Sequence, residues 1–361
     1  MKKIVYFFAL FSIITGCLDQ IELDVPDDLQ RSSLLIQGSL TKSETAQASV
    51  NIQILPGLDR FNAPISVISA AVNLRDEDGQ TFPLPHVGEG FYEAAIPETG
   101  NFQVEFFRDY QLQVTLSDGR TFESAPETLL PVPEISAIQT DSIVREVAGE
   151  EEGEVENVTF IEFYVDSPLR ISEEAEKSRL RWEVYEAFEF GEDNPRMETT
   201  RVCYITQVLN RSDVKIYNGQ TFSGEILERH PLTATRLDFR FAEGYFVTVV
   251  QESLSAEAFT YWEQVQTVTE RNGNMFDEPP GQIVNNLRST GDTEQEVFGY
   301  FSVSAQDTAR LYIAPESVGP PRFYCPLPPR PGIPPPPPTL CDSCLLWGPT
   351  STYEQPEYWI Q

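Results

Sequence analysis

Acidic residues ahead of a glycine give this sequence its first candidate for chemistry. Three of them precede Gly79 in DEDGQTF, residues 76–82, which is the composition of a calcium-binding loop. Such a loop also needs carboxylates at alternating positions and a later bidentate glutamate, and neither follows Gly79. The related strings DGRTF at 118–122 and NGQTF at 218–222 each come after an alternating apolar–polar triplet. Because Asp-Gly and Asn-Gly favour the type I′ turn of a β-hairpin, we predict three hairpin turns and no metal site.

Histidines and nucleophile motifs give little support for catalysis. The sequence has only two histidines, His86 and His230, and neither lies in a recognisable catalytic setting. No G-x-S-x-G, H-E-x-x-H, P-loop or G-x-G-x-x-G string is present. The 56 acidic residues guarantee carboxylate pairs somewhere, so pairs alone do not indicate glycoside hydrolysis. We therefore expect no enzyme activity and no cofactor, and a hydrolase with an unrecognised carboxylate pair is the third-ranked hypothesis.

The first cysteine points to a lipid anchor. Lys2 and Lys3 precede an apolar run from Ile4 to Ile14, which is too short to span a bilayer and fits a secretory signal. The run ends in ITGC, which resembles a bacterial lipobox, so we expect a diacylglyceryl group on Cys17. Acyl chains hold a protein on a membrane without a spanning helix. An ordinary secreted protein with an incidental cysteine is the alternative.

The other four cysteines are candidates for disulfides, because an even number in an exported chain favours pairing. They are Cys203, Cys325, Cys341 and Cys344. The proline-rich segment 326–339 favours an extended polyproline II conformation, which would separate Cys325 from the last two cysteines. We therefore favour Cys203–Cys325 with a local Cys341–Cys344 bridge, and the other two pairings stay open. A four-thiolate zinc site is disfavoured in an oxidising compartment.

Composition limits the partners. Asp and Glu number 56 against 25 Lys and Arg, for a net charge of −31. Such a polyanion repels phosphate backbones, so we expect no nucleic-acid partner. Trp347 and Trp359 could present flat faces to a ligand, although strapping the tail onto the body is the favoured role for both.

The elements that must position these residues are mostly strands. Short alternating runs at intervals of about ten residues across 34–130 predict a β-sandwich, and further runs after the prolines at 126–133 predict a second β-rich domain. Residues 101–107 and 236–241 are among the predicted strands. The segment 253–273 predicts one helix over about 255–271, with Ser253 or Ser255 as its cap, Gly273 at its end and its aromatic stripe packed on a sheet. The expected organisation is a signal peptide at 1–16, a lipidated tether at 17–33, domains at 34–131 and 132–324, and a cysteine-containing tail at 325–361.

Several strings together resemble a known family. They are AAVNLRDEDGQTFPL, YQLQVTLSDGRTFESAPETLLPVPEI, SLSAEAFTYWEQVQ, MFDEPPGQIVNNL and VFGYFSVS. On these the chain resembles the Bacteroidota lipoproteins grouped as domain of unknown function 4249. Its first domain is similar to the immunoglobulin-like and prealbumin-like sandwiches of carboxypeptidase-regulatory domains. The resemblance also implies O-glycan acceptors at Ser142 and Thr308, within Asp-Ser-Ile and Asp-Thr-Ala.

The resemblance implies a role beside a transporter. Such lipoproteins tend to be encoded next to TonB-dependent outer-membrane receptors. Our first hypothesis is therefore a cell-surface, outer-membrane lipoprotein that helps such a receptor capture a ligand of unknown identity. The alternative is a surface adhesin, or a polysaccharide- or matrix-binding protein built of β-sandwiches.

Overall fold

The structure is a computed structural model that describes residues 33–56, 63–149, 153–192, 201–210, 212–270, 283–291, 296–319 and 340–359. Within these ranges the chain is mainly β with one prominent helix, which confirms the predicted fold class. The predicted signal peptide, Cys17 and the proline-rich segment lie outside the described residues. No helix of the described residues is long and apolar enough to cross a membrane.

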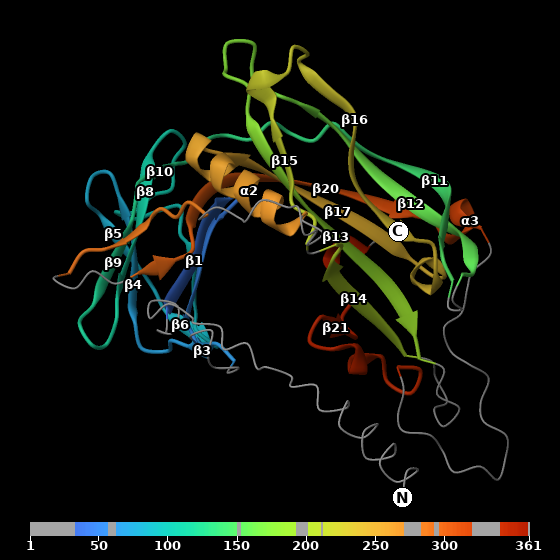
Figure 1. Cartoon of the computed structure of the whole chain (residues 1–361), viewed down its shortest axis with the longest axis horizontal. Coiled ribbons are helices and arrows are strands. Elements are labelled where there is room, and N and C mark those ends of the chain that lie inside the picture. The colour runs from blue at the N-terminus through green and yellow to red at the C-terminus, as the bar shows by residue number, and fades with distance from the viewer. Residues whose placement is uncertain are drawn as a thin grey trace, which may run out of the picture.

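Among the described residues, the largest sheet has twelve strands and runs through the whole molecule (Figure 1). Its main path is β21 (Ser351–Thr352), β14 (Val202–Val208), β13 (Arg179–Gly191), β17 (Tyr245–Leu254), β20 (Phe301–Ile313), β1 (Ser33–Lys42), β2 (Ala46–Leu55), β7 (Phe91–Ile96) and β6 (His86–Gly88). Three short strands lie off that path: β15 (Lys215–Asn218) pairs with β13, β19 (Val297–Phe298) with β1, and β3 (Ile65–Ser66) with β2.

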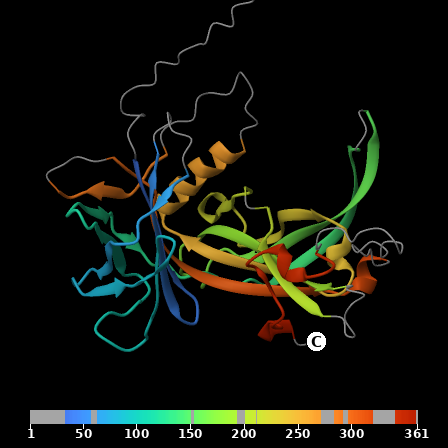
Figure 2. The same ribbon diagram turned by 90° about the horizontal axis from the view of Figure 1, so that it is seen from below.

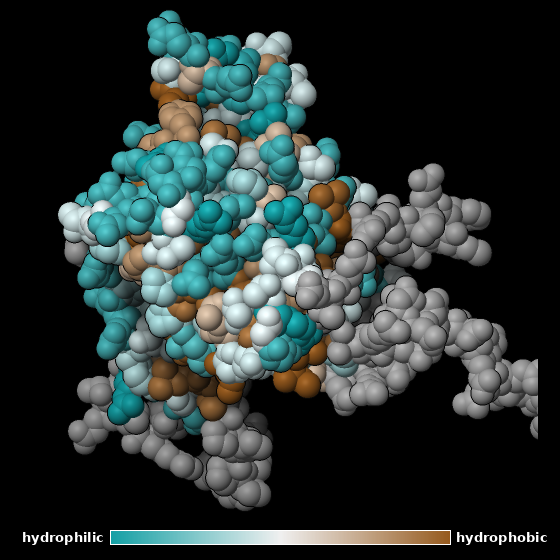
Figure 3. All heavy atoms as spheres, turned by 90° about the vertical axis from the view of Figure 1, so that its left-hand side faces the viewer, coloured by the Kyte–Doolittle hydropathy of each residue, from teal (hydrophilic) through white to brown (hydrophobic). Residues whose placement is uncertain are grey.

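Two smaller sheets complete the described part of the fold. The first has the order β18 (Leu287–Ser289), β9 (Thr121–Ser124), β8 (Asp109–Thr115), β4 (Ala71–Asp76) and β5 (Thr81–Leu84), with β10 (Glu127–Thr128) beside β8. The second is β11 (Ala137–Ala148), β12 (Val155–Pro168) and β16 (Ile226–Arg236). Seen from the side of the first small sheet, the surface is mostly hydrophilic with small hydrophobic patches (Figure 3).

Each small sheet encloses a hydrophobic core with the large sheet. Strand β20 contributes Phe301 and Val303 to the first core and Ile313 to the second. Side chains two residues apart on a strand point to the same side. Both of these cores therefore lie on one face of the large sheet, and neither covers its other face.

The large sheet is continuous across the predicted domain boundary at 131. Strand β1 pairs in parallel with β20, where Gly38 lies opposite Phe301. The core of the first sandwich also contains Leu287 and Val297, which come from the segment assigned to the second domain. The two predicted domains thus share one sheet. Apolar side chains from the second predicted domain are buried in the core of the first.

The predicted helix is confirmed as α2 (Ala256–Thr269), which the side chain of Ser255 caps by accepting a 3.0 Å hydrogen bond from the Ala258 backbone N–H. Ala258 is buried against the sheet, whereas Tyr261 and Trp262 are only half-buried. Figure 2 shows α2 lying above the strands of the large sheet, close to the N-terminal strands coloured blue. Gly273 lies outside the described residues. A short helix, α3 (Pro315–Val318), follows β20.

Two of the three predicted hairpin turns are confirmed, but their turn type is wrong. The backbone N–H of Gly79 donates to Asp76 (3.1 Å) and that of Gly119 to Leu116 (3.0 Å), and both glycines have positive φ. The residues before them do not, so these are type I turns followed by a left-handed glycine and not type I′ turns. The third prediction is wrong: Asn218 ends β15 and caps the 3-10 helix η1 (Gly219–Thr221).

Two predicted strands are also wrong. Residues 101–107 form a loop in which Phe107 has a φ of 63° and is 68% exposed. Residues 239–241 form the 3-10 helix η2 (Phe239–Phe241), which Asp238 caps. Next to it the fully buried Glu186 accepts two hydrogen bonds from Arg240, at 2.6 and 2.8 Å. A buried ion pair, invisible in a local apolar–polar pattern, thus outweighs the strand signal.

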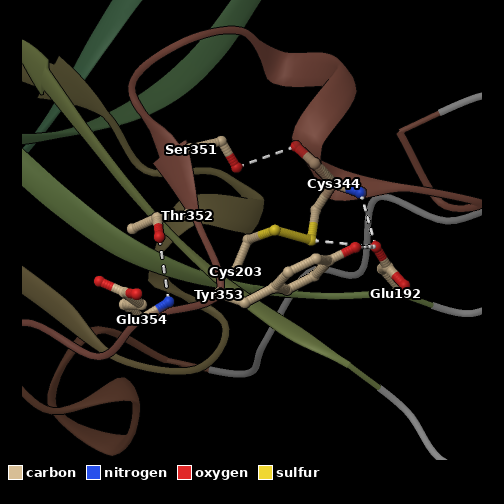
Figure 4. The surroundings of a disulfide bond; sticks show 7 residues. All are labelled: Glu192, Cys203, Cys344, Ser351, Thr352, Tyr353 and Glu354. Carbon is tan, nitrogen blue, oxygen red and sulfur yellow. Dashed lines mark hydrogen bonds between the residues drawn. A yellow bond between two sulfur atoms is a disulfide. The ribbon is translucent and has the colours of Figure 1, made fainter.

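The C-terminal segment wraps around the edge of the large sheet. A disulfide joins Cys203 of β14 to Cys344, at the start of the 3-10 helix η3 (Cys344–Trp347) (Figure 4). The favoured pairing Cys203–Cys325 is therefore wrong, and so is a local Cys341–Cys344 bridge. Cys341 is also disulfide-bonded, and Cys325 lies outside the described residues. Strand β21 pairs with β14 and covers the edge that would otherwise be open.

Candidate functional site

The face of the large sheet opposite the two cores carries a cleft beside α2. This α2 cleft has a volume of about 410 Å³, within the range typical of small-molecule sites. Its walls come from β1, β2, β7, β20, β13 and β17 on the sheet side and from α2 on the other. The residues that line the cleft include Ser39, Asn51, Phe91, Arg181, Trp262 and Ser302.

Strand register explains why polar side chains line the cleft. Ser39 of β1 lies directly opposite Ser49 of β2 on one side and Ser302 of β20 on the other. Glu93 of β7 lies opposite Ser49 and accepts a 2.8 Å hydrogen bond from its hydroxyl. Residues directly opposite one another project to the same face, so these side chains form one row across four strands. The alternate residues of the same strands belong to the first core.

A charged cluster closes one end of the cleft. The Arg181 guanidinium donates to Glu252 (2.5 Å) and to Glu183, and lies 3.9 Å from the ring centre of Trp262. Burial acts to lower the pKa of Arg181, but the attraction of the two carboxylates outweighs it and raises the pKa. Burial acts to raise the pKa of Glu183, but Arg181 and a hydrogen bond from Tyr185 lower it overall.

Every carboxylate oxygen of this cluster already accepts a hydrogen bond. Glu252 accepts from Arg181 and, at 2.7 Å, from the amide of Gln306. Glu183 accepts from Arg181 and, at 2.7 Å, from the hydroxyl of Tyr185. The carboxylate oxygens of Glu183 and Glu252 are therefore all occupied by donors from described residues, and none is free to bind a metal ion.

A second cavity of about 290 Å³ adjoins the cluster on its other side. Arg181, Glu183 and Trp262 line both hollows, so the stacked Arg181–Trp262 pair is the partition between them. The second cavity is lined by more apolar side chains, among them Val184, Leu232 and Val265. The partition depends on one cation–π contact and two ion pairs.

Glu127 anchors the end of α2 nearest the cleft. It is 2% exposed, and its carboxylate accepts hydrogen bonds from Ser255 (2.6 Å), Asn286 (3.2 Å) and Tyr300. Burial raises its pKa, although these three donors act to lower it. Tyr300 in turn stacks on Tyr261 of α2 at 4.4 Å. The donors are all neutral, so Glu127 links β10, α2 and the start of β20 without a salt bridge.

Glu192 is a further buried acid, and its contacts are with the C-terminal segment. Glu192 accepts hydrogen bonds from the Cys344 backbone N–H (3.0 Å) and from the Tyr353 hydroxyl (2.8 Å), as Figure 4 shows. Among the described residues, Glu192, Cys203 and Cys344 form the one cluster with metal-ligand spacing. Both sulfurs are consumed by the disulfide, so this cluster cannot offer thiolates to a metal.

The structure places the sequence-predicted residues away from the cleft. Trp359 is 1% exposed and packs on Phe246, which leaves no face for a ligand, so the stacking role considered for it is wrong. Trp347 packs against Phe188 on the opposite face of the sheet, and its stacking role stays a prediction. These contacts agree with the role favoured from the sequence, in which both tryptophans attach the C-terminal tail to the body of the protein. His230 lies between aromatic rings, and burial lowers its pKa.

The acceptors implied by the resemblance are accessible. Ser142 lies on β11 and Thr308 on β20, and both are exposed. Their glycosylation stays a prediction, as does lipidation of Cys17, which lies outside the described residues.

A comparison with protein families decides the relationship. The model of a family described as domain of unknown function (DUF4249) matches residues 19–310, most of the chain. The protein belongs to the DUF4249 family. No curated protein matches the sequence. The match includes every residue that lines the α2 cleft, so the cleft is built from the DUF4249 portion of the chain.

The sequence did not predict most of the α2 cleft. In it, Ser39, Ser49 and Asn51 form the polar half of alternating strands, which is the ordinary pattern of a solvated face. The available signal was the uncharged character of these positions, since hydroxyl and amide side chains stand there instead of Lys or Glu. Which strands lie side by side could not be read, because β1 and β20 are more than 250 residues apart.

Proposed function

We propose that this protein is an outer-membrane lipoprotein without catalytic activity, which captures a small ligand for a TonB-dependent outer-membrane transporter. The observation that carries the binding role is the α2 cleft, a small-molecule-sized hollow with hydroxyl, amide and aromatic walls. The lipid anchor rests on the ITGC string ending at Cys17. The transporter partner rests on the resemblance described above, because a fold alone does not specify a function.

Electrostatics favour binding over hydrolysis. A glycosidase needs one protonated and one ionised carboxyl group, with pKa values pushed apart by their surroundings. In the α2 cleft a single guanidinium, Arg181, pairs with both Glu183 and Glu252. The lowered pKa of Glu183 keeps it ionised at neutral pH, so it is a poor general acid. These features support a non-enzymatic role.

The test is co-purification from the native host. The full chain with a C-terminal affinity tag is extracted from envelopes in mild detergent and captured, and its partners are identified by mass spectrometry. We expect a large TonB-dependent β-barrel receptor and a diacylglyceryl adduct on Cys17. A Cys17→Ala variant, the matched control, should lose the adduct and leave the membrane fraction.

Two results would count against the proposal. One is an unmodified, freely released chain, and the other is repeated capture without any β-barrel receptor. Binding to polysaccharide or matrix surfaces that persists in a strain lacking the receptor would favour the adhesin alternative.

A further inference from the structure

We propose that the α2 cleft binds a neutral, hydroxyl-rich ligand, an oligosaccharide. This inference rests on the proposed function and names the ligand class of the same site. Four independent features of the cleft support it: its row of hydroxyl and amide groups, an unpaired amide donor, its charge balance, and an exposed aromatic ring at its rim.

The row of hydroxyl and amide groups offers both donors and acceptors. Ser39, Ser302 and Gln37 line the cleft, and their side chains make no hydrogen bond to any described residue. A hydroxyl group both donates and accepts, and an amide does the same through separate atoms. Sugar hydroxyls have the same dual character, so a ligand rich in hydroxyls can satisfy several of these groups at once.

An unpaired donor points into the same region. Asn51 Nδ2 is buried and has no hydrogen-bond partner, although Asn51 lines the cleft. A buried polar atom without a partner costs free energy, so such an atom in a folded protein calls for an explanation. A ligand oxygen seated between β1 and β7 would accept from Asn51 Nδ2 and remove this cost.

The charges of the residues that line the cleft disfavour ionic ligands. Arg181 is the one cation among the described lining residues, and Glu183 and Glu252 already neutralise it. A phosphate or carboxylate ligand would find no free positive charge. A cationic ligand would have to displace Arg181, Gln306 or Tyr185 from carboxylate oxygens that they already occupy. The site therefore suits an uncharged ligand.

The rim supplies an aromatic surface. Phe91 lies directly opposite Asn51 in the β2–β7 pair and is 39% exposed, so its ring stands beside the unpaired amide. Aromatic side chains combine a large apolar face with little loss of conformational freedom on binding. The apolar C–H face of a sugar ring can pack on Phe91 while its hydroxyls reach Asn51 and Ser39.

The experiment is a glycan array probed with the purified full chain. The array carries neutral oligosaccharides, their uronate and sulfated counterparts, and unrelated short peptides as a separate set. We expect binding to one or more neutral oligosaccharides, with charged counterparts of the same backbone bound at least tenfold more weakly. The affinity for the best neutral glycan is then measured by calorimetry.

Two variants with matched controls tie binding to the cleft. Asn51→Leu removes the donor and should weaken binding by about tenfold or more, whereas Asn73→Leu, in β4 of the small sheet, should not change it. Phe91→Ala should also weaken binding, whereas Phe106→Ala, a similarly exposed phenylalanine at 43%, should not. Far-ultraviolet circular dichroism checks that all four variants fold.

Each outcome bears on the proposal separately from the proposed function. Preferred binding of anionic glycans or peptides, no binding on the whole array, or equal effects of Asn51→Leu and Asn73→Leu would overturn the ligand class. Receptor co-purification would still support the transporter role in those cases. Conversely, neutral-glycan binding without any receptor partner would leave this inference standing and remove the proposed transporter function.

Discussion

Replacing Arg181 with Met tests the charged cluster that partitions the two cavities. The substitution keeps most of the side-chain volume but leaves the carboxylates of Glu183 and Glu252 without their cation. The Glu252 side chain is 11% exposed, so solvent screens little of the Arg181–Glu252 attraction that the substitution removes. The Glu183 side chain is 34% exposed, so solvent partly screens the Arg181–Glu183 attraction.

The expected cost follows from these surroundings. Removing one partner of a buried ion pair typically costs about 3–5 kcal/mol, and the stacked contact with Trp262 adds about 0.5–2 kcal/mol. Because Glu183 is partly exposed, we expect a total loss of about 3–5 kcal/mol in the free energy of unfolding at pH 7. Arg145→Met is the matched control. Arg145 also pairs with a glutamate and lies over an aromatic ring, but its side chain is 46% exposed, so we expect a loss of about 0–1 kcal/mol.

The assay is equilibrium unfolding in urea, followed by tryptophan fluorescence and circular dichroism, at several pH values. Arg181 lowers the pKa of Glu183, so this carboxylate stabilises the native state above its ordinary pKa of 4.5, and the benefit is lost as the pH falls through the lowered value. The difference between wild type and Arg181→Met should therefore shrink below pH 4.5. Equal losses for Arg181→Met and Arg145→Met, or a difference independent of pH, would refute the reasoning.

Three further predictions follow from other parts of the structure. Non-reducing peptide mapping should recover Cys203 linked to Cys344, and their replacement by alanine should cost about 2–5 kcal/mol in a urea titration; a Cys203–Cys325 peptide would contradict the structure. Burial raises the pKa of Glu127 above 4.5, so between 4.5 and the raised value the folded chain keeps a proton that the unfolded chain releases. The free energy of unfolding should therefore fall as the pH rises from 4.5 through the raised value. A Glu127→Gln variant should lack this slope, and an unchanged slope would assign it to another group. Trp359→Ala should cost about 3 kcal/mol, near the low end for buried aromatic residues because the indole N–H has no partner; a loss below about 1 kcal/mol would show that the tail does not secure the sheet edge.

Local patterns in the sequence predicted the elements well where burial is one-sided. Alternation identified β1, β2, β4 and β8, and the Ser255 cap with its aromatic stripe identified α2. They failed where a tertiary contact overrides the local signal. Residues 236–241 alternate like a strand, yet the pairing of Arg240 with buried Glu186 holds them as the end of β16 and a 3-10 turn.

Two strands, β11 and β16, give only a weak strand signal in the sequence, for different reasons. Strand β11 is exposed along most of its length, so AIQTDSIVREVA carries little hydrophobic signal. Strand β16 contains Pro231, which cannot donate a backbone hydrogen bond and is tolerated here because β16 is an edge strand. The disulfide pairing was wrong for a different reason, since nothing local indicates that the chain after the prolines returns to β14.

The candidate site was the least predictable part. Its wall combines strands that begin at residues 33 and 301 with a helix between them, so only the folded register brings Ser39, Ser49 and Ser302 into one row. The acidic strings that first suggested chemistry proved to be turns. Glu77 and Asp78 instead pair with Arg108 on the surface.

The central claim is that the α2 cleft holds a ligand. It is tested most directly by identifying the small molecules that co-purify with the protein from its native host. The full chain is purified from the native host as wild type, as Ser302→Trp, which fills the cleft, and as Thr308→Trp, on the same face of β20 but outside the cleft. Small molecules released by denaturation are identified by mass spectrometry. We predict a neutral, hydroxyl-rich compound bound to wild type and Thr308→Trp and absent from Ser302→Trp. The same compounds in all three samples, or none in any, would contradict the claim.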